Sequence, residues 1–197
     1  MIGVSVTENL FIPLSDGVRL AARLWLPADA ETKKVPAILE YIPYRKRDGT
    51  RARDEPMHGW FAENGYAAIR VDMRGSGESD GLMADEYSAQ ELNDACEVIA
   101  WLARQSWCSG RVGMMGKSWG GFNALQTAAL RPPALKAIIT VCSTDDRYAD
   151  DDHIFAIAVA PLIRHYTLIR VIAVDPAETG GIAVELVQRR RVCVEAI

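Results

Sequence analysis

The chain has 197 residues, of which 49% are hydrophobic and 24% charged, a composition typical of one packed domain and not of a disordered chain. With 22 Lys and Arg against 26 Asp and Glu, the formal charge is -4. A basic surface of the kind that binds DNA or RNA is therefore not expected. The four cysteines form no C-x-x-C pair, which argues against a zinc ribbon and a disulfide scaffold.

Two segments of the chain are candidates for a signal peptide and for a membrane-spanning helix. The amino-terminal residues lack a basic stretch followed by an uninterrupted apolar one, so no signal peptide is expected. Residues 154–174 are long enough to span a bilayer, but they include Arg164, His165 and Arg170. Charges inside hydrocarbon are costly. We therefore expect a soluble, cytoplasmic protein that does not bind membranes.

The chain begins with a predicted β-hairpin. Residues 10–14 and 18–26 flank Ser15, Asp16 and Gly17, and Asp-Gly is a strong signal for a tight turn. Apolar and polar residues alternate along the second segment, as in a half-buried strand.

The pattern then changes to an alternation of strands and helices. Short apolar runs, typical of strands covered on both faces, lie at residues 36–42, 66–71, 111–115 and 135–141. Helices are predicted over residues 56–64, 88–102 and 119–130. The second helix opens with a capping box, Ser88 to Glu91. This order predicts an α/β fold with a doubly wound, mostly parallel sheet. We assign residues 1–145 to this core and residues 146–197 to the start of a cap-like region and a divergent tail.

The strongest chemical signal is the G-x-S-x-G pentapeptide of residues 116–120, GKSWG. It follows a predicted strand and opens a predicted helix, the setting of a nucleophile elbow. The serine of such an elbow occupies a sharp turn, and glycines two residues before and after it let neighbouring chains approach without a Cβ clash. The alternative is a glycine-rich turn with an inert serine.

Two further loops follow predicted strands. Residues 72–79 (DMRGSGES) do not complete G-x-G-x-x-G, because position 80 is Asp. We therefore expect a structural loop, with Arg74 held by carboxylates or carbonyls, and not a phosphate cradle. In residues 43–46 (PYRK), Tyr44 could offer its hydroxyl to an oxyanion, or it could pack at a strand end.

Together these features resemble the CocE/NonD hydrolases, a family that includes X-Pro dipeptidyl-peptidase-like (S15) and cocaine-esterase-like enzymes. The resemblance covers residues 8–153. It rests on the motifs SDGV (15–18), PYRK (43–46), DMRGSG (72–77), GKSWGG (116–121) and CSTDDRY (142–148). The last motif is similar to the family's passage from the sheet into its helical cap.

The resemblance implies an α/β-hydrolase fold and a set of site residues. Ser118 would be the nucleophile that forms an acyl-enzyme. The Tyr44 hydroxyl and the backbone N–H of Trp119 would bind the oxyanion. The implied substrates are small esters, amides or short peptides, including N-terminal X-Pro dipeptides. No metal or organic cofactor is implied.

The general base stays open. A serine nucleophile needs a base that is itself oriented by an acid, and the chain has only His58, His153 and His165. His58 precedes the serine and lies in a predicted helix, so a core or surface role is favoured. His153 and His165 follow the serine, where the family's cap begins.

The acid is equally open. α/β-hydrolases place Ser, Asp or Glu, and His in that order along the chain. Asp175 would close an apolar strand at residues 168–174, but no histidine follows it. Asp145, after the preceding strand, is the other candidate. We interpret the crowded aspartates of residues 145–152 as a solvated cap entrance and not as a calcium loop.

Because family members are longer and the family-like pattern stops near residue 153, we expect a truncated or frame-shifted member. Two alternatives to a hydrolase remain. One is an acyltransferase, in which an alcohol or amine replaces water. The other is a non-catalytic fragment that lacks the triad histidine and self-associates through an exposed sheet edge.

Overall fold

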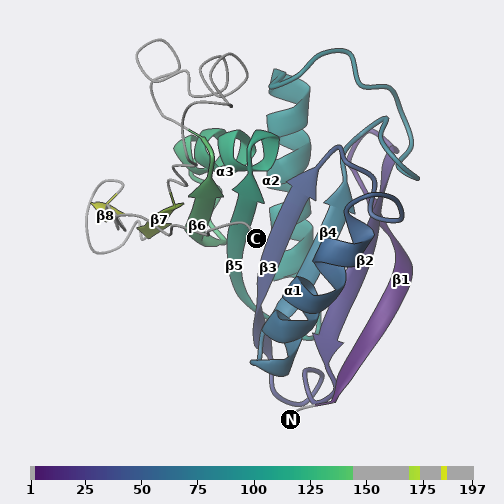
Figure 1. The fold of residues 1–197 in the computed structure, drawn as a ribbon, viewed down its shortest axis with the longest axis vertical. Coiled ribbons are helices and arrows are strands. Elements are labelled where there is room, and N and C mark those ends of the chain that lie inside the picture. Colours follow the sequence, from purple (N-terminus) through teal and green to yellow (C-terminus); the bar gives the residue numbers. More distant parts are fainter. Residues whose placement is uncertain (1–2, 144–168, 174–182, 186–197) are drawn as a thin grey trace, which may run out of the picture.

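The computed structural model describes residues 3–143, and the backbone of residues 169–173 and 183–185. These residues form one eight-stranded sheet in the order β1-β2-β4-β3-β5-β6-β7-β8 (Figure 1). The strands are β1 (Val4–Pro13), β2 (Arg19–Pro27), β3 (Val35–Ile42), β4 (Ala67–Asp72), β5 (Cys108–Lys117), β6 (Leu135–Val141), β7 (Ile169–Ala173) and β8 (Ala183–Glu185). The helices are α1 (Arg51–Glu63), α2 (Ala89–Ala103) and α3 (Trp119–Ala129).

The predicted hairpin is confirmed. β1 and β2 pair antiparallel, and Leu14 N–H donates to Val18 O across the turn at 2.8 Å. Gly17 has φ +89°, a conformation that glycine adopts without steric cost. The Asp16 carboxylate accepts the Val18 N–H at 3.1 Å, so Asp-Gly specifies the turn as expected.

The parallel part of the sheet lies in its middle. β4, β3, β5 and β6 are parallel neighbours, whereas β2 meets β4 antiparallel and β7 meets β6 antiparallel. The predicted α/β class and doubly wound sheet are confirmed, with antiparallel strands at both edges. Because the carboxyl ends of parallel strands lie on the same side of the sheet, the loops after β3, β4 and β5 gather along that side.

The helices cover both faces of the sheet (Figure 1). Successive residues of a strand point to opposite faces. In β3, the Tyr41 hydroxyl donates to the Glu91 carbonyl of α2 at 3.3 Å, whereas Glu40 meets Arg53 of α1 at 2.9 Å. α2 and α3 pack with the sheet around the main apolar core, and α1 covers the smaller cluster of Trp25, Ala62 and Ala68.

The prediction for α1 was wrong at its start. The helix begins at Arg51, with Pro56 inside it. The prediction placed Pro56 at the first turn, where proline costs no hydrogen bond. Contacts made by Asp54 with Arg53 (2.6 Å) and Arg70 (3.3 Å) hold the earlier turn in place. The predicted capping box of α2 is confirmed by the Glu91 N–H, which donates to Ser88 Oγ at 3.2 Å.

Within the described residues, no helix is both long and apolar enough to cross a membrane.

Candidate active site

The turn between β5 and α3 has the geometry of a nucleophile elbow. Ser118 has φ +55° and ψ -119°, a sparsely populated combination that costs a non-glycine residue free energy. Its N–H donates to Val141 O at 2.8 Å, and its carbonyl accepts the Phe122 N–H at 3.0 Å. The strained residue is thereby tied to the end of β6 and to the first turn of α3, and its side chain is half-buried.

The glycines of the pentapeptide are required by close approach. A Cβ on Gly116 would collide with the backbone of Gly120, and a Cβ on Gly120 would lie 2.5 Å from Ile42 Cγ2. A Cβ on Gly121 would lie 2.6 Å from Ser143 Oγ. Strand β5, helix α3 and strand β3 therefore approach each other more closely than side chains allow.

The first turn of α3 supplies donors beside the serine. Trp119 is the first residue of α3, so its backbone N–H is among those without an intrahelical partner. The helix dipole adds positive partial charge at this end. A developing oxyanion on a carbonyl attacked by Ser118 would be stabilised here.

Tyr44 lies in the loop that follows β3, at the sheet edge that also bears Ser118. Its side chain is 42% exposed. At this exposure Tyr44 is not a core residue. Its role as an oxyanion donor stays a prediction.

The loop that bears Tyr44 is held by the loop after β4. Ser76 Oγ donates to Pro43 O at 2.5 Å, and Lys46 N–H donates to Asp72 Oδ1 at 2.7 Å. The buried Lys46 ammonium pairs with Glu78. Contacts with residues 72–78 thus hold Pro43 and Lys46, on both sides of Tyr44.

The prediction that residues 72–79 form a structural loop is confirmed. Arg74 forms two hydrogen bonds with Asp94, at 2.7 and 2.9 Å, and an ion pair with Asp16 at 2.8 Å. These carboxylates raise the pKa of Arg74. Arg74 therefore joins the amino-terminal hairpin to α2. A Cβ on Gly77 would collide with the Asp72 carboxylate, so glycine is needed in this loop also.

A buried carboxylate stands next to the elbow. Glu91, 5% exposed, accepts the indole N–H of Trp119 at 2.8 Å and the backbone N–H of Tyr87 at 2.8 Å. The Tyr87 ring packs against the rings of Trp119 and Phe122, with centroids 5.3 and 5.6 Å apart. Burial raises the pKa of Glu91, and the bonds from Trp119 and Asn123 oppose that rise.

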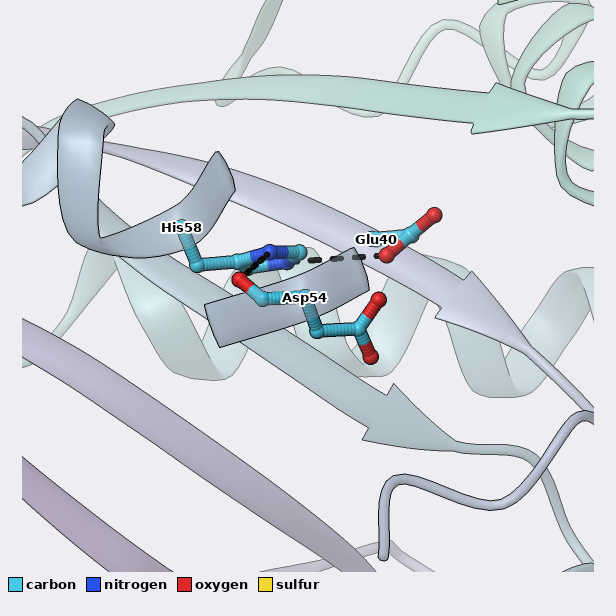
Figure 2. Close-up of side chains that lie close together, drawn as sticks. All are labelled: Glu40, Asp54 and His58. Carbon is cyan, nitrogen blue, oxygen red and sulfur yellow. Dashed lines mark hydrogen bonds and ion pairs between the residues drawn. The ribbon is translucent and has the colours of Figure 1, made fainter. Parts of the chain in front are cut away.

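A second cluster of titratable groups lies beneath α1. Figure 2 shows His58 close to both Glu40 and Asp54, with His58 Nε2 3.5 Å from Glu40 Oε2 and Nδ1 3.2 Å from the Asp54 carbonyl. All three are buried, and their ligand atoms lie within 4.8 Å of one another. A metal could in principle use these atoms. However, the guanidinium groups of Arg53 and Arg70 already lie against both carboxylates.

These arginines make the cluster an ion network and not a metal centre. Burial raises the pKa of Glu40 from 4.5 to about 7, against the opposing effect of Arg53 and Arg70. Burial also lowers the pKa of His58 from 6.5 to about 4, so His58 is neutral near pH 7. His58 stacks against Trp25 with a centroid distance of 4.8 Å. Of the two roles expected for His58, core or surface, the structure shows the core role.

A cavity of about 50 Å³ lies beside α2 and is lined by Met73, Arg74 and Glu91 among others. This volume holds a water molecule or two. Substrate pockets are several times larger. A substrate-sized acyl pocket would need residues beyond those that line this cavity.

The remaining predicted site residues lie outside the described residues. They are Asp145, His153, His165 and Asp175, and residues 144–148 of the last motif lie outside the described residues as well. The strand expected before Asp175 is present as β7. It runs antiparallel to β6, with Ala173 opposite Ala137, so β7 ends at the sheet edge opposite the elbow.

The sheet order and the elbow together define an α/β hydrolase. A CocE/NonD family hydrolase of Staphylococcus aureus superposes with a TM-score of 0.61 and 26% identity, covering 74% of this chain and 28% of that one. An α-amino acid ester hydrolase superposes with a TM-score of 0.54 and 29% identity, over 68% of this chain and 24% of that one.

Residues 16–159 match the family described as X-Pro dipeptidyl-peptidase (S15 family), and the chain belongs to that family. It is 36% identical over 146 residues to the cocaine esterase of Rhodococcus sp., covering 73% of this chain and 25% of the relative. It is 26% identical over 170 residues to the Xaa-Pro dipeptidyl-peptidase of Pediococcus pentosaceus, covering 75% and 21%. The chain therefore spans about a quarter of the length of these relatives.

Sequence reasoning missed the second role of Glu91. The capping box identified it as a helix-start residue, but its bond to Trp119 joins residues 28 positions apart. The network around His58 was missed for the same reason, since Glu40, Asp54 and Arg70 come from three elements. One signal in the sequence could have indicated this buried ion network: the charged residues Glu40 and Arg70 each lie within a short apolar run, in β3 and β4.

Proposed function

We propose that this chain carries the nucleophile and the oxyanion donors of a serine hydrolase that acts on ester or amide acyl groups. The observation that carries the proposal is the backbone of Ser118, held at φ +55° between β5 and α3. Strain of this kind persists only where surrounding contacts enforce it, and it concentrates at functional sites. Membership in a family of esterases and dipeptidyl-peptidases supports the same chemistry.

In the proposed reaction, Ser118 Oγ attacks the substrate carbonyl carbon while a base takes the hydroxyl proton. The carbonyl π electrons move to oxygen, and the Trp119 N–H and the Tyr44 hydroxyl stabilise that charge. Collapse of the tetrahedral species expels the alcohol or amine, which takes up the proton, and leaves an acyl-enzyme. Water then releases the acid and regenerates Ser118.

The base and acid of this scheme remain predictions. His153 or His165 would serve as base, oriented by Asp145 or Asp175. Of the two acids Asp145 is favoured, because β7, the strand before Asp175, ends on the side of the sheet opposite the elbow. His58 is excluded, because its side chain is buried between α1 and the sheet, where it contacts Glu40. The proposed substrates are small esters and amides, X-Pro peptides among them, because the named relatives are an esterase and a dipeptidyl-peptidase.

The test is intact-mass analysis after incubation with a fluorophosphonate, which phosphonylates activated serines. We expect one adduct on the wild-type chain and none on Ser118→Ala. Ser109→Ala, at an exposed serine in β5, the strand that precedes Ser118, is the matched control and should keep the adduct. If the folded wild-type chain takes no label, the elbow is present without an effective base, and the non-catalytic alternative holds.

A further inference from the structure

Glu91 makes more bonds than a helix cap requires. In a capping box, the acidic side chain satisfies backbone N–H groups at the helix start, and one oxygen of Glu91 does so by accepting the Tyr87 N–H. The other oxygen accepts the Trp119 indole N–H at 2.8 Å, which belongs to α3. A single carboxylate therefore joins the start of α2 to the start of α3.

Two of the residues bound by Glu91, Tyr87 and Trp119, lie at or directly beside a strained point of the backbone. Tyr87 has φ +55°, and Trp119 directly follows Ser118, which also has φ +55°. The Tyr87 ring lies against the Trp119 ring, so the indole is held at its edge by a hydrogen bond and on its surface by an aromatic contact. Strained conformations of this kind need surroundings that over-determine them.

The carboxylate is costly to bury unless its bonds are made. Glu91 is 5% exposed, and a buried anion without donors is strongly unfavourable. The indole has a single N–H group, which can only donate. The Trp119 ring therefore satisfies Glu91 only when this edge of the ring faces the carboxylate. The bond therefore fixes the side chain of Trp119, and through its Cα the orientation of the first peptide of α3.

That peptide carries the N–H assigned above to the oxyanion. A donor of this type stabilises a transition state only when it is aimed at the position of the developing charge, and supporting contacts decide how precisely it is held. We propose that Glu91 is a positioning residue of the elbow, which holds the Ser118–Trp119 peptide through the Trp119 indole so that its N–H faces the oxyanion.

This inference rests on the proposed function and is tested with three variants of the full chain. Glu91→Gln keeps the size of the side chain, but replaces one acceptor oxygen with a donor. Trp119→Phe removes the indole N–H and keeps an aromatic ring and the backbone N–H. Glu97→Gln is the matched control on α2, because its carboxylate binds Ser15 at 2.7 Å and not the elbow.

The first readout is the rate of fluorophosphonate labelling of Ser118. We expect Glu91→Gln and Trp119→Phe each to lower the maximal labelling rate about 10- to 100-fold, the range expected for a misaimed donor. The half-saturating probe concentration should not change, and the double variant should be no slower than Glu91→Gln. Wild-type rates in either single variant, or multiplied effects in the double variant, would overturn the inference.

The second readout does not depend on activity. In ¹H–¹⁵N NMR spectra, we expect Glu91→Gln to shift the backbone amide resonance of Trp119, and Glu97→Gln to leave it unchanged. The wild-type indole resonance, assigned by its loss in Trp119→Phe, should move as Glu91 titrates and stay constant in Glu91→Gln. If the wild-type chain takes no label, the proposed function fails, and the backbone amide resonance of Trp119 decides the inference alone. The inference is overturned if Glu91→Gln leaves that resonance unmoved.

Discussion

Two regions of the molecule look functional for opposite reasons. Beneath α1, the histidine His58 lies against two carboxylates, Glu40 and Asp54 (Figure 2). The elbow presents the serine of a G-x-S-x-G motif, but no histidine other than His58 occurs in residues 3–143. A search for acid and base side chains alone would therefore favour the first region.

Burial and backbone geometry reverse that choice. His58 is fully buried and neutral near pH 7, and the carboxylates around it are paired with Arg53 and Arg70. Such a network cannot reach a substrate, and it serves to join α1 to the sheet. Ser118 is half-buried in a strained turn at the edge where α/β sheets carry their sites. In the proposed function, exposure and backbone strain therefore weigh more than the inventory of acid and base side chains.

The largest expected effect comes from adding a methyl group at the elbow, which tests the difference between the elbow and the cluster beneath α1. In Gly116→Ala the new Cβ would collide with the backbone of Gly120, so we expect a loss of about 3 kcal/mol or more in unfolding free energy, together with loss of serine labelling. Gly59→Ala is the matched control, because a Cβ at Gly59 meets nothing within 4 Å. Alanine there should stabilise α1 slightly. Urea denaturation measures both, and equal stabilities would contradict the packing argument.

Removing one charge beneath α1 should cost stability without touching the chemistry. Asp54→Ala leaves the buried Arg70 short of a partner 3.3 Å away, and breaking buried ion pairs costs about 3 kcal/mol. The fluorophosphonate rate of the folded fraction should equal that of wild type. A slower rate at unchanged stability would show that the α1 cluster serves the active site after all.

Tyr44→Phe should have the opposite effects to Asp54→Ala: a lower activity and an unchanged stability. The hydroxyl is an oxyanion donor in the proposed mechanism, and loss of one such donor lowers turnover about 100-fold. Because the side chain is 42% exposed, the thermal midpoint should hardly change. Hydrolysis of a p-nitrophenyl ester and a thermal melt measure the two effects. Full activity in the phenylalanine variant would remove Tyr44 from the mechanism.

The smallest effects concern pH. The pKa of His58 falls from 6.5 to about 4 on folding, so the unfolded chain binds more protons between these values and stability rises with pH there. The pKa of Glu40 rises from 4.5 to about 7, so the native chain binds more protons in that window and stability falls as pH rises. In the wild type these two contributions oppose each other between pH 4.5 and 6.5.

Single variants should separate the two slopes. Glu40→Gln leaves the His58 contribution, so stability should increase with pH by about 1 kcal/mol per pH unit at most. His58→Asn leaves the Glu40 contribution, so stability should decrease by a similar amount. Denaturation curves at pH 4.5, 5.5 and 6.5 test this, and slopes of the same sign in both variants would refute the assignment.

The sequence by itself determined the features that depend on a few consecutive residues. The Asp-Gly turn and the capping box at Ser88 follow from local backbone preferences, and the G-x-S-x-G pattern identified the strand–serine–helix turn at Ser118. All three are present. The alternation of strands and helices likewise determined the α/β class. Patterns of this kind are visible because the interacting groups lie within a few positions of one another.

Only the tertiary structure decided which distant groups meet. The register of the parallel strands sets Ile42 opposite Asp72, and this brings the Asp72 carboxylate to the Lys46 N–H beside Tyr44. The packing of α2 against α3 sets Glu91 against Trp119, and the position of α1 buries His58 over Glu40. Each contact joins residues 18 to 28 positions apart, and its geometry depends on how whole elements pack, which no local pattern encodes.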